Sequence, residues 1–279
     1  MILVAGATGN VGGELVHTLV DAGQDVRALA RGPGRSAFPP GVEFAVGDLN
    51  QPESLSHALA GVRQAFLPSG YQDMPGLLAR MRNAGVEHVV LLSGSSAGSG
   101  DLTNAISRYM ILSETALRAS GMAWTVLRPY GFMSNALQWA SQLRAGDVVR
   151  APFGDARVAV IDPYDIAAAA ATVLSQEGHG GGTYVLSGPE PSRPADRVRV
   201  LAAVLGRDLR FKAQPDAEAR AEMSAAMATE YVDAFFNFWA DGTLDESTAL
   251  PTVEQLTGRP PRTFEQWARA HADAFRLPL

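Results

Sequence analysis

A turn built on three evenly spaced glycines opens the chain, in the stretch 6–12 (GATGNVG). A short apolar run, 2–5, precedes this turn, and a segment with apolar residues at helical spacing, 10–22, follows it. In such strand–turn–helix units the first glycine permits the tight turn, the second lets the backbone approach a pyrophosphate, and the third lets helix and strand pack closely. The free N–H groups at the start of the helix then face the pyrophosphate. An ordinary glycine-rich connection is the alternative to a dinucleotide site formed by Gly6, Thr8, Gly9, Asn10, Val11 and Gly12.

Short apolar runs alternate with helical patterns along the first half of the chain. We expect strands at 2–5, 25–30, 42–46, 64–67, 88–92 and 124–127. Helices are expected between them, at 10–22, 52–60, 75–83 and 103–119. This alternation is typical of a parallel sheet with crossover helices. The fold class we predict is therefore α/β, a Rossmann-type doubly wound parallel sheet.

The pattern changes beyond Pro129. It predicts a helix at 132–144, an extended segment at 157–161, a helix at 163–175, a strand at 183–186 and then mostly short helices. We therefore predict an NAD(P)-binding Rossmann domain at 1–187 and a smaller, mainly helical C-terminal substrate lobe at 188–279. The segment 131–155 is expected to contribute to the lobe.

Composition limits the partners and the chemistry open to this chain of 279 residues. The net charge is −6, which offers no general attraction for nucleic acid. The chain has no cysteine and its five histidines form no ligand-spaced pair, so we expect no metal site. No apolar stretch is long enough to span a bilayer, and the apolar start carries no basic residue, so we expect neither a membrane segment nor a signal peptide. These observations predict a cytoplasmic protein, either a monomer or a homodimer.

The end of the second expected strand bears on the choice of cofactor. NAD enzymes place an acidic residue there, about 20 residues beyond the glycines, to bind the ribose 2′-hydroxyl. This chain has Arg31 at that position and Asp25 at the opposite end of the strand. Arg31, with Arg35 close behind it, can bind a 2′-phosphate, which favours NADP(H) over NAD(H). A solvated residue at the end of a strand is the alternative for Arg31.

Further cofactor contacts are expected where the next strands end. Asp48 follows the third strand, where its carboxylate can accept from the adenine amino group while Leu49 packs on the ring. A turn or helix cap is the alternative for Asp48, and both roles can coexist. The other cofactor candidates follow later strands and are Leu67, Pro68, Ser69, Ser93, Tyr130 and Phe132.

Motifs spread over the whole chain resemble a known family. They are the turn 6–12, Arg31, 47–49 (GDL), 125–129 (TVLRP), 162–167 (DPYDIA), 184–190 (YVLSGPE) and 256–264 (LTGRPPRTF). Together they are similar to the atypical short-chain dehydrogenase/reductases, and more narrowly to the NmrA-like branch. The resemblance implies NAD(P) binding, with activities that include quinone, enone or carbonyl reduction. The family that the chain resembles also includes members that bind the cofactor as redox sensors without turnover.

The chain departs from that superfamily at its proton relay. Standard members carry a Tyr-x-x-x-Lys pair, with a glutamate four residues beyond the lysine, and that glutamate corresponds to Glu114. The lysine position then falls on Met110 and the tyrosine position on Ile106, both apolar. The only lysine in the chain is Lys212, far along in the lobe. The usual relay is therefore missing.

Two weak catalytic candidates remain, Tyr109 and Ser93. Tyr109 lies one residue before the lysine position, so it points about 100° around the helix from it. A tyrosine that packs against a neighbouring helix is the alternative.

Hydride transfer to a conjugated acceptor needs no such relay, because the acceptor can take its proton from water. Aromatic residues after the sixth strand and in the lobe favour a hydrophobic small-molecule substrate, although such residues also form cores and dimer interfaces. We therefore predict an NAD(P)H-dependent reductase of a hydrophobic conjugated carbonyl, enone or quinone. The alternative is an NADP(H)-binding redox sensor that acts through a protein partner. The candidate substrate residues are Tyr71, Tyr130, Phe132, Met133, Trp139, Tyr231, Phe235 and Trp239.

Overall fold

Seven strands pair in parallel to form one sheet in the computed structural model, which describes residues 1–32 and 38–276. The strands are β1 (Ile2–Ala5), β2 (Val26–Ala30), β3 (Glu43–Val46), β4 (Gln64–Pro68), β5 (His88–Leu92), β6 (Ala123–Pro129) and β8 (Gly182–Leu186). Their order is β3-β2-β1-β4-β5-β6-β8, so the direction of winding reverses between β1 and β4. This is the doubly wound Rossmann arrangement, and the predicted fold class is confirmed. Ligands of such sheets bind outside the carboxyl ends of the strands, at the point of reversal.

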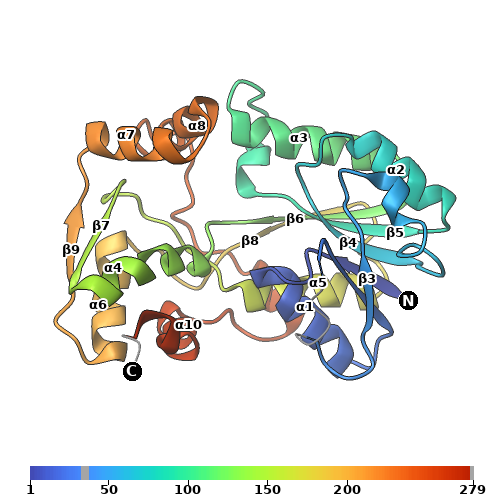
Figure 1. The fold of residues 1–279 in the computed structure, drawn as a ribbon, viewed down its shortest axis with the longest axis horizontal. Coiled ribbons are helices and arrows are strands. Elements are labelled where there is room, and N and C mark those ends of the chain that lie inside the picture. The colour runs from blue at the N-terminus through green and yellow to red at the C-terminus, as the bar shows by residue number, and fades with distance from the viewer. Residues whose placement is uncertain (33–37, 277–279) are drawn as a thin grey trace.

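Helices cover both faces of this sheet (Figure 1). One face is covered by α1 (Asn10–Asp21), α5 (Pro163–Ser175) and the short α9 (Thr252–Thr257). The other face is covered by α2 (Met74–Asn83) and α3 (Ala105–Arg118). Because both faces are covered, the central strands are buried and read in the sequence as continuous apolar runs.

Local sequence explains where two of the elements begin and end. α5 begins at Pro163 because the Asp162 carboxylate caps it, accepting the Tyr164 N–H at 2.9 Å. The helix expected at 52–60 is only a 3₁₀ helix, Pro52–Leu55, followed by turns. The chain must turn back into β4 through Gly61, at φ +74°, which leaves little length for a helix.

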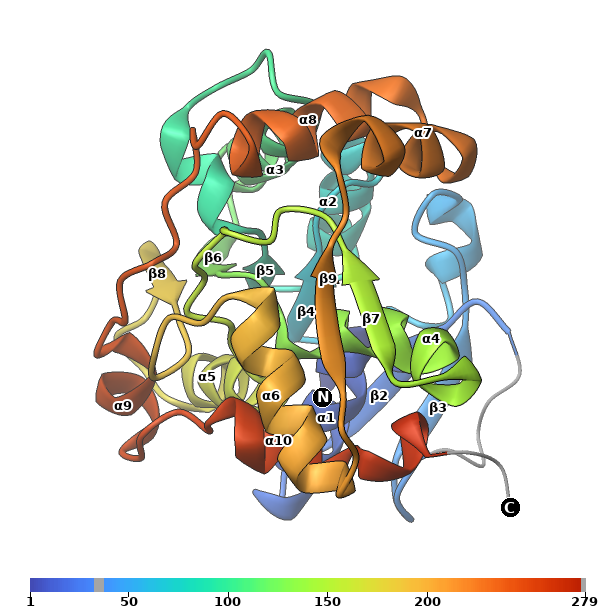
Figure 2. The same cartoon turned by 90° about the vertical axis from the view of Figure 1, so that its left-hand side faces the viewer.

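A second core lies beside the sheet (Figure 2). Trp267 is fully buried at its centre, against Phe264 and Phe275. Two strands of this region, β7 (Val148–Ala151) and β9 (Arg210–Ala213), pair in parallel, and neither was predicted from the sequence. Each is only four residues long, and neither has an apolar run that marks it as a strand. The region is formed by a 3₁₀ helix at Met133–Trp139, α4 (Ala140–Ala145), β7 (Val148–Ala151), α6 (Pro194–Leu205), β9 (Arg210–Ala213), α10 (Phe264–Ala270) and a 3₁₀ helix at Ala272–Phe275.

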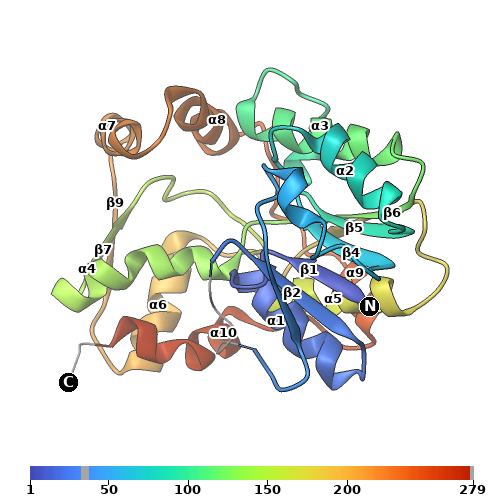
Figure 3. The same cartoon turned by 45° about the vertical axis from the view of Figure 1, so that its right-hand side comes forward.

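Two further helices, α7 (Asp216–Ala226) and α8 (Thr229–Trp239), connect this second core to the sheet domain (Figure 3). α8 packs against the start of α3, where the Asn104 side-chain amide donates to the Ala234 carbonyl at 3.2 Å. An ion pair between Arg108 and Glu230, at 2.7 Å, joins the same two helices. None of the helices in residues 1–32 and 38–276 is long and apolar enough to cross a membrane.

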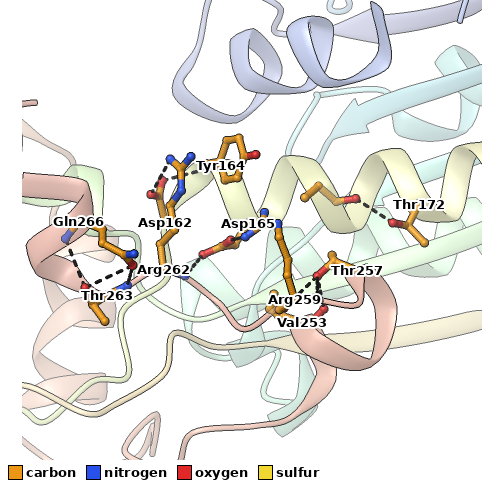
Figure 4. A network of polar contacts seen from close by, with 11 residues as sticks. Asp162, Tyr164, Asp165, Thr172, Val253, Thr257, Arg259, Arg262, Thr263 and Gln266 are labelled. Carbon is orange, nitrogen blue, oxygen red and sulfur yellow. Dashed lines mark hydrogen bonds and ion pairs between the residues drawn. The ribbon is translucent and has the colours of Figure 1, made fainter. Parts of the chain in front are cut away.

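Residues of the motif 256–264, near the C-terminal end of the chain, pack against α5 (Figure 4). Asp165 on α5 is completely buried, and its carboxylate accepts Arg259 Nη1 and the Arg262 backbone N–H, both at 2.7 Å. The Arg262 guanidinium also lies over the Tyr164 ring, 3.4 Å from its centroid. Burial raises the pKa of the Asp165 carboxyl above its ordinary value, although the contacts with Arg262 and Arg259 act in the opposite direction. These contacts therefore hold the segment between α9 and α10 against α5.

Candidate active site

The glycine turn at the end of β1 has the geometry that a pyrophosphate site requires. Gly6 adopts φ +65°, a conformation that other residues rarely take. A Cβ added at Gly12 would lie 2.7 Å from the Gly6 carbonyl carbon and closer still to its oxygen, so no larger residue fits there. Thr8, Gly9 and Asn10 are exposed at the start of α1, whose first turn contains no acidic residue. The residues present therefore fit the phosphates of a dinucleotide.

The opposite end of the expected cofactor site lies beyond β2 and β3. Arg31 is exposed directly after β2, and Arg35 lies outside the described residues. The Asp48 carboxylate accepts the Asn50 N–H at 2.9 Å, so Asp48 forms the turn that was the alternative for it. Leu49 is buried in the core between the sheet and α2.

Tyr71 belongs to this same end of the sheet edge. Burial raises the pKa of its hydroxyl, and the charges of Arg31 and Asp48 act on it in opposite directions. The next residue, Gln72, donates its N–H to the Asn50 side chain at 3.1 Å. The loop that carries Tyr71 therefore lies beside the segment that follows β3.

The remaining cofactor candidates lie where β4, β5 and β6 end. Pro68 contacts the glycine turn, since a Cβ at Gly6 would lie 3.4 Å from its ring. Ser69 is half-buried beside it and donates its N–H to the Leu92 carbonyl at 3.0 Å, whereas Leu67 is fully buried in the core. Tyr130 is buried and Phe132 half-buried, and Phe132 packs against the core beneath α1 and α5.

Ser93, a cofactor candidate and a weak catalytic candidate, is held in a buried cluster. Its hydroxyl donates to Glu114 at 2.7 Å, and the same carboxylate accepts Arg128 at 2.7 Å and Arg118 at 2.8 Å. Burial by itself raises the pKa of the Glu114 carboxyl, but the hydrogen bonds and charge of Arg128, with Ser93 and Arg118, lower it below its ordinary value. Glu114 is therefore an ionised structural anchor, and Ser93 is already engaged with it.

Met110, at the position expected for the lysine, lies beside the segment that follows β5. The Met110 sulfur would lie 2.7 Å from a Cβ at Gly94, just beyond the end of β5, and it accepts the Ser96 hydroxyl at 3.6 Å. A thioether, which cannot donate a proton, therefore lies beside Gly94 and Ser96. The Tyr109 ring instead packs on Gly70, and burial raises the pKa of the Tyr109 hydroxyl, with Tyr231 nearby.

Glu246 is a functional candidate that the sequence analysis missed. It lies on the loop after α8, is 3% exposed, and accepts the Gly131 N–H at 2.9 Å and the Ser95 hydroxyl. It therefore bridges the segments that follow β5 and β6, where the nicotinamide end of a dinucleotide is expected. Burial raises the pKa of its carboxyl, and no ion pair within the described ranges involves Glu246. No local motif marks this residue, and only the fold brings it beside Gly131.

A cavity of about 450 Å³ begins at the same place. The residues that line it include Gly131, Val158 and Val160, together with Ala219 and Met223 of α7. Three of the substrate candidates line it, namely Trp139, Phe235 and Trp239.

The other substrate candidates lie elsewhere. Met133 lines a neighbouring cavity of about 440 Å³ on the far side of Val160 and Arg197. Tyr231 is exposed and lies toward Tyr109 at the contact between α3 and α8.

Comparisons with known proteins agree with this geometry. Residues 6–177 match the model of the family described as NAD(P)H-binding. The chain belongs to this family. It is 41% identical to the (4-alkanoyl-5-oxo-2,5-dihydrofuran-3-yl)methyl phosphate reductase of Streptomyces griseus and 36% identical to the NAD(P)H azoreductase of Xenophilus azovorans, with 99% of each chain covered in both alignments. The expected resemblance to the NmrA-like, atypical short-chain dehydrogenase/reductases is confirmed, and the chain is an NAD(P)H-dependent oxidoreductase.

The fold itself recurs in a solved structure. The NADPH complex of the NADPH-dependent quinone oxidoreductase of Escherichia coli superposes with a TM-score of 0.80, covering 98% of this chain and all of that one. The two sequences are 24% identical, so this likeness concerns the fold.

Proposed function

We propose that the chain uses NADPH to reduce a hydrophobic conjugated carbonyl, enone or quinone. The observation that carries the proposal is the position of the cavity of about 450 Å³, which opens at Gly131, beyond β6. β6 lies beyond β4 and β5 from the strand that carries the glycine turn. In the Rossmann arrangement the nicotinamide of a dinucleotide is expected on this side of the sheet. Its lining is largely apolar, which suits a flat hydrophobic acceptor.

Separate residues hold the two ends of the cofactor in this proposal. The N–H groups at the start of α1 bind the pyrophosphate, and Arg31 binds the 2′-phosphate, which gives the preference for NADPH. Pro68, Ser69, Tyr130 and Phe132 surround the other end. When bound, the nicotinamide supplies the hydride.

The chain contributes orientation and exclusion of water to the chemical step. Aromatic side chains of α8, Phe235 and Trp239, cover the acceptor, and Met110 presents no proton donor. With no proton donor at Met110, the proton that accompanies the hydride would come from water. A conjugated acceptor suits this arrangement, because it can accept the hydride without a positioned acid.

The names of relatives support this substrate class. The Streptomyces griseus relative is named for a furanone and the Xenophilus azovorans relative for azo compounds. A further relative, 27% identical over 282 residues, is the quinone oxidoreductase 2 of Escherichia coli. Each named acceptor is an unsaturated, electron-poor system.

Consumption of NADPH with a panel of acceptors tests the proposal. Purified protein is mixed with NADPH and a series of quinones, enones and azo compounds without oxygen, and absorbance is followed at 340 nm. We expect turnover with at least one conjugated acceptor and none with isolated alcohols or saturated ketones. Tight NADPH binding without turnover on the entire panel would contradict the proposal. It would favour the redox sensor, which requires unequal affinities for NADP⁺ and NADPH.

A further inference from the structure

A positively charged side chain lies between the two cavities and forms no ion pair in the part of the chain that the structure describes. Arg197 of α6 lines both cavities, and its guanidinium lies 5.8 Å from the centroid of the Trp139 ring. Among the hydrogen bonds and ion pairs of residues 1–32 and 38–276, none involves the Arg197 side chain. Burial lowers the pKa of the guanidinium to about 10, and nearby Asp196 partly offsets this. Arg197 is half-buried, and its Nε is fully buried with no hydrogen-bond partner among the described residues, whereas buried donors are normally hydrogen-bonded.

Two other hydrogen-bond donors of the same cavity also have no acceptor. The Gln214 side chain is 8% exposed, and the Trp139 side chain 3% exposed. Neither the Gln214 Nε2 nor the Trp139 Nε1 has a hydrogen-bond partner in the part of the chain that the structure describes. All three unsatisfied groups are N–H donors, so the group that would satisfy them is rich in acceptor oxygens.

Acidic residues near this cavity do not fill that role. Glu218 pairs with Arg150 at 2.5 Å, which uses the charge of both. Glu222 lines the cavity but is exposed on α7. The N–H groups of Arg197, Gln214 and Trp139 therefore still lack an acceptor among the described residues.

We propose that Arg197 binds an anionic oxygen group of the substrate, a carboxylate, sulfonate or phosphate. This rests on the proposed function, because it places the conjugated part of the substrate near Gly131 and its anionic substituent at Arg197. Both residues line the cavity of about 450 Å³, whose wall between them includes Val160. The Arg197 guanidinium lies near the Trp139 ring, and its Nε is buried with no hydrogen-bond partner among the described residues, so it can donate to the oxygens of a bound anion. Arg197 is then a specificity residue, which selects acidic substrates over neutral ones.

A matched pair of acceptors tests this role. A naphthoquinone with a short carboxylate side chain and its methyl ester carry the same reducible ring and differ in charge. We expect the wild-type protein to prefer the acid in kcat/KM by at least about 10-fold, since a hydrogen bond to a charged group contributes this much. Arg197→Met should lower kcat/KM for the acid about 10- to 100-fold, mainly through KM, and change the ester by less than about 3-fold. Arg197→Lys, which keeps the charge, should restore part of the preference.

The control is Arg210→Met, because Arg210 lies on β9 with a side chain that is 75% exposed and lines neither cavity. It should leave both acceptors unaffected. Inorganic phosphate should compete with the acid and leave turnover of the ester unchanged. Stimulation by phosphate would overturn the inference, because the site would then serve a separate anion. An equal loss on both acceptors in Arg197→Met, or no preference in the wild type, would also overturn it.

Binding measurements separate this inference from the proposed function. The acceptor panel decides the proposed function, and if neither member of the matched pair is turned over, calorimetry on the NADP⁺-loaded protein still decides the role of Arg197. Tighter binding of the acid than of the ester, lost in Arg197→Met, supports it. Equal binding of acid and ester to the wild type contradicts it.

Discussion

The two ends of one sheet edge are built in different ways. Beyond β1 the site consists of backbone, and glycines fix its geometry within seven consecutive residues, 6–12. Beyond β6 it consists of side chains from distant segments, where Glu246 reaches Gly131 across 115 positions of the chain. A backbone site admits almost no substitution, whereas a site made of side chains can change its ligand while the fold is kept. The predictions below test this difference.

The largest effect is expected at Gly12. A Cβ there collides with the backbone of Gly6, so Gly12→Ala must displace the turn. We expect Tm to fall by about 10 °C or more and NADPH binding to become undetectable. Gly13→Ala is the matched control, because its Cβ would make an ordinary contact with the Ala7 carbonyl at 3.5 Å. If both variants bind NADPH equally well, the close packing of the turn is not what forms the site.

The next prediction concerns how much the contacts between α5 and the motif 256–264 stabilise the fold. Asp165→Ala leaves Arg259 and the Arg262 N–H without their acceptor, and we expect a loss of about 2–4 kcal/mol in the free energy of unfolding. Chemical denaturation measures it. Asp273→Ala removes the surface pair with Arg276, in which the Asp273 side chain is 91% exposed, and should leave stability unchanged. Equal stability of the two variants would mean that the contacts between α5 and the motif 256–264 do not stabilise the fold.

Arg31→Asp tests the cofactor end without touching its backbone. Losing the guanidinium and adding a negative charge should weaken NADPH about 30- to 100-fold, because charge-assisted hydrogen bonds to the 2′-phosphate are lost. NADH, which lacks that phosphate, should bind as before. Arg63→Asp is the control, since Arg63 pairs with Glu87 at the amino end of β4, away from the cofactor. Titrations of both cofactors give the ratio, and an unchanged ratio would remove the case for Arg31.

The smallest effect is expected at Glu246 and depends on pH. Because burial raises its pKa in the folded protein, the protonated form contributes stability below its ordinary pKa of 4.5, and this is lost as pH rises through the raised value. Glu246→Gln keeps the contact with the Gly131 N–H and stays neutral. Its Tm should therefore exceed that of the wild type at neutral pH by about 2–4 °C, with the difference vanishing near pH 4. A difference that is constant with pH would show that the carboxyl does not titrate in this range.

The same contrast explains how much could be predicted from the sequence. The turn at 6–12 and the strands of the sheet follow from local patterns, and the structure agrees with both. Glu246 and Arg197 carry no local motif, because their neighbours come from other elements. The strands β7 and β9 are short and pair with each other across about 60 positions, so no periodicity marks them.

Transfer of deuterium from labelled cofactor tests whether this protein delivers a hydride from NADPH to a conjugated acceptor. NADPH labelled at C4 on one face, and separately on the other, is reacted with an enone that the protein reduces. Mass spectrometry then locates the label in the product. We expect deuterium at the β-carbon from only one of the two labelled cofactors, with the hydrogen at the α-carbon drawn from solvent as a proton. Label from neither cofactor, in a protein that binds NADPH, would contradict hydride transfer at this site.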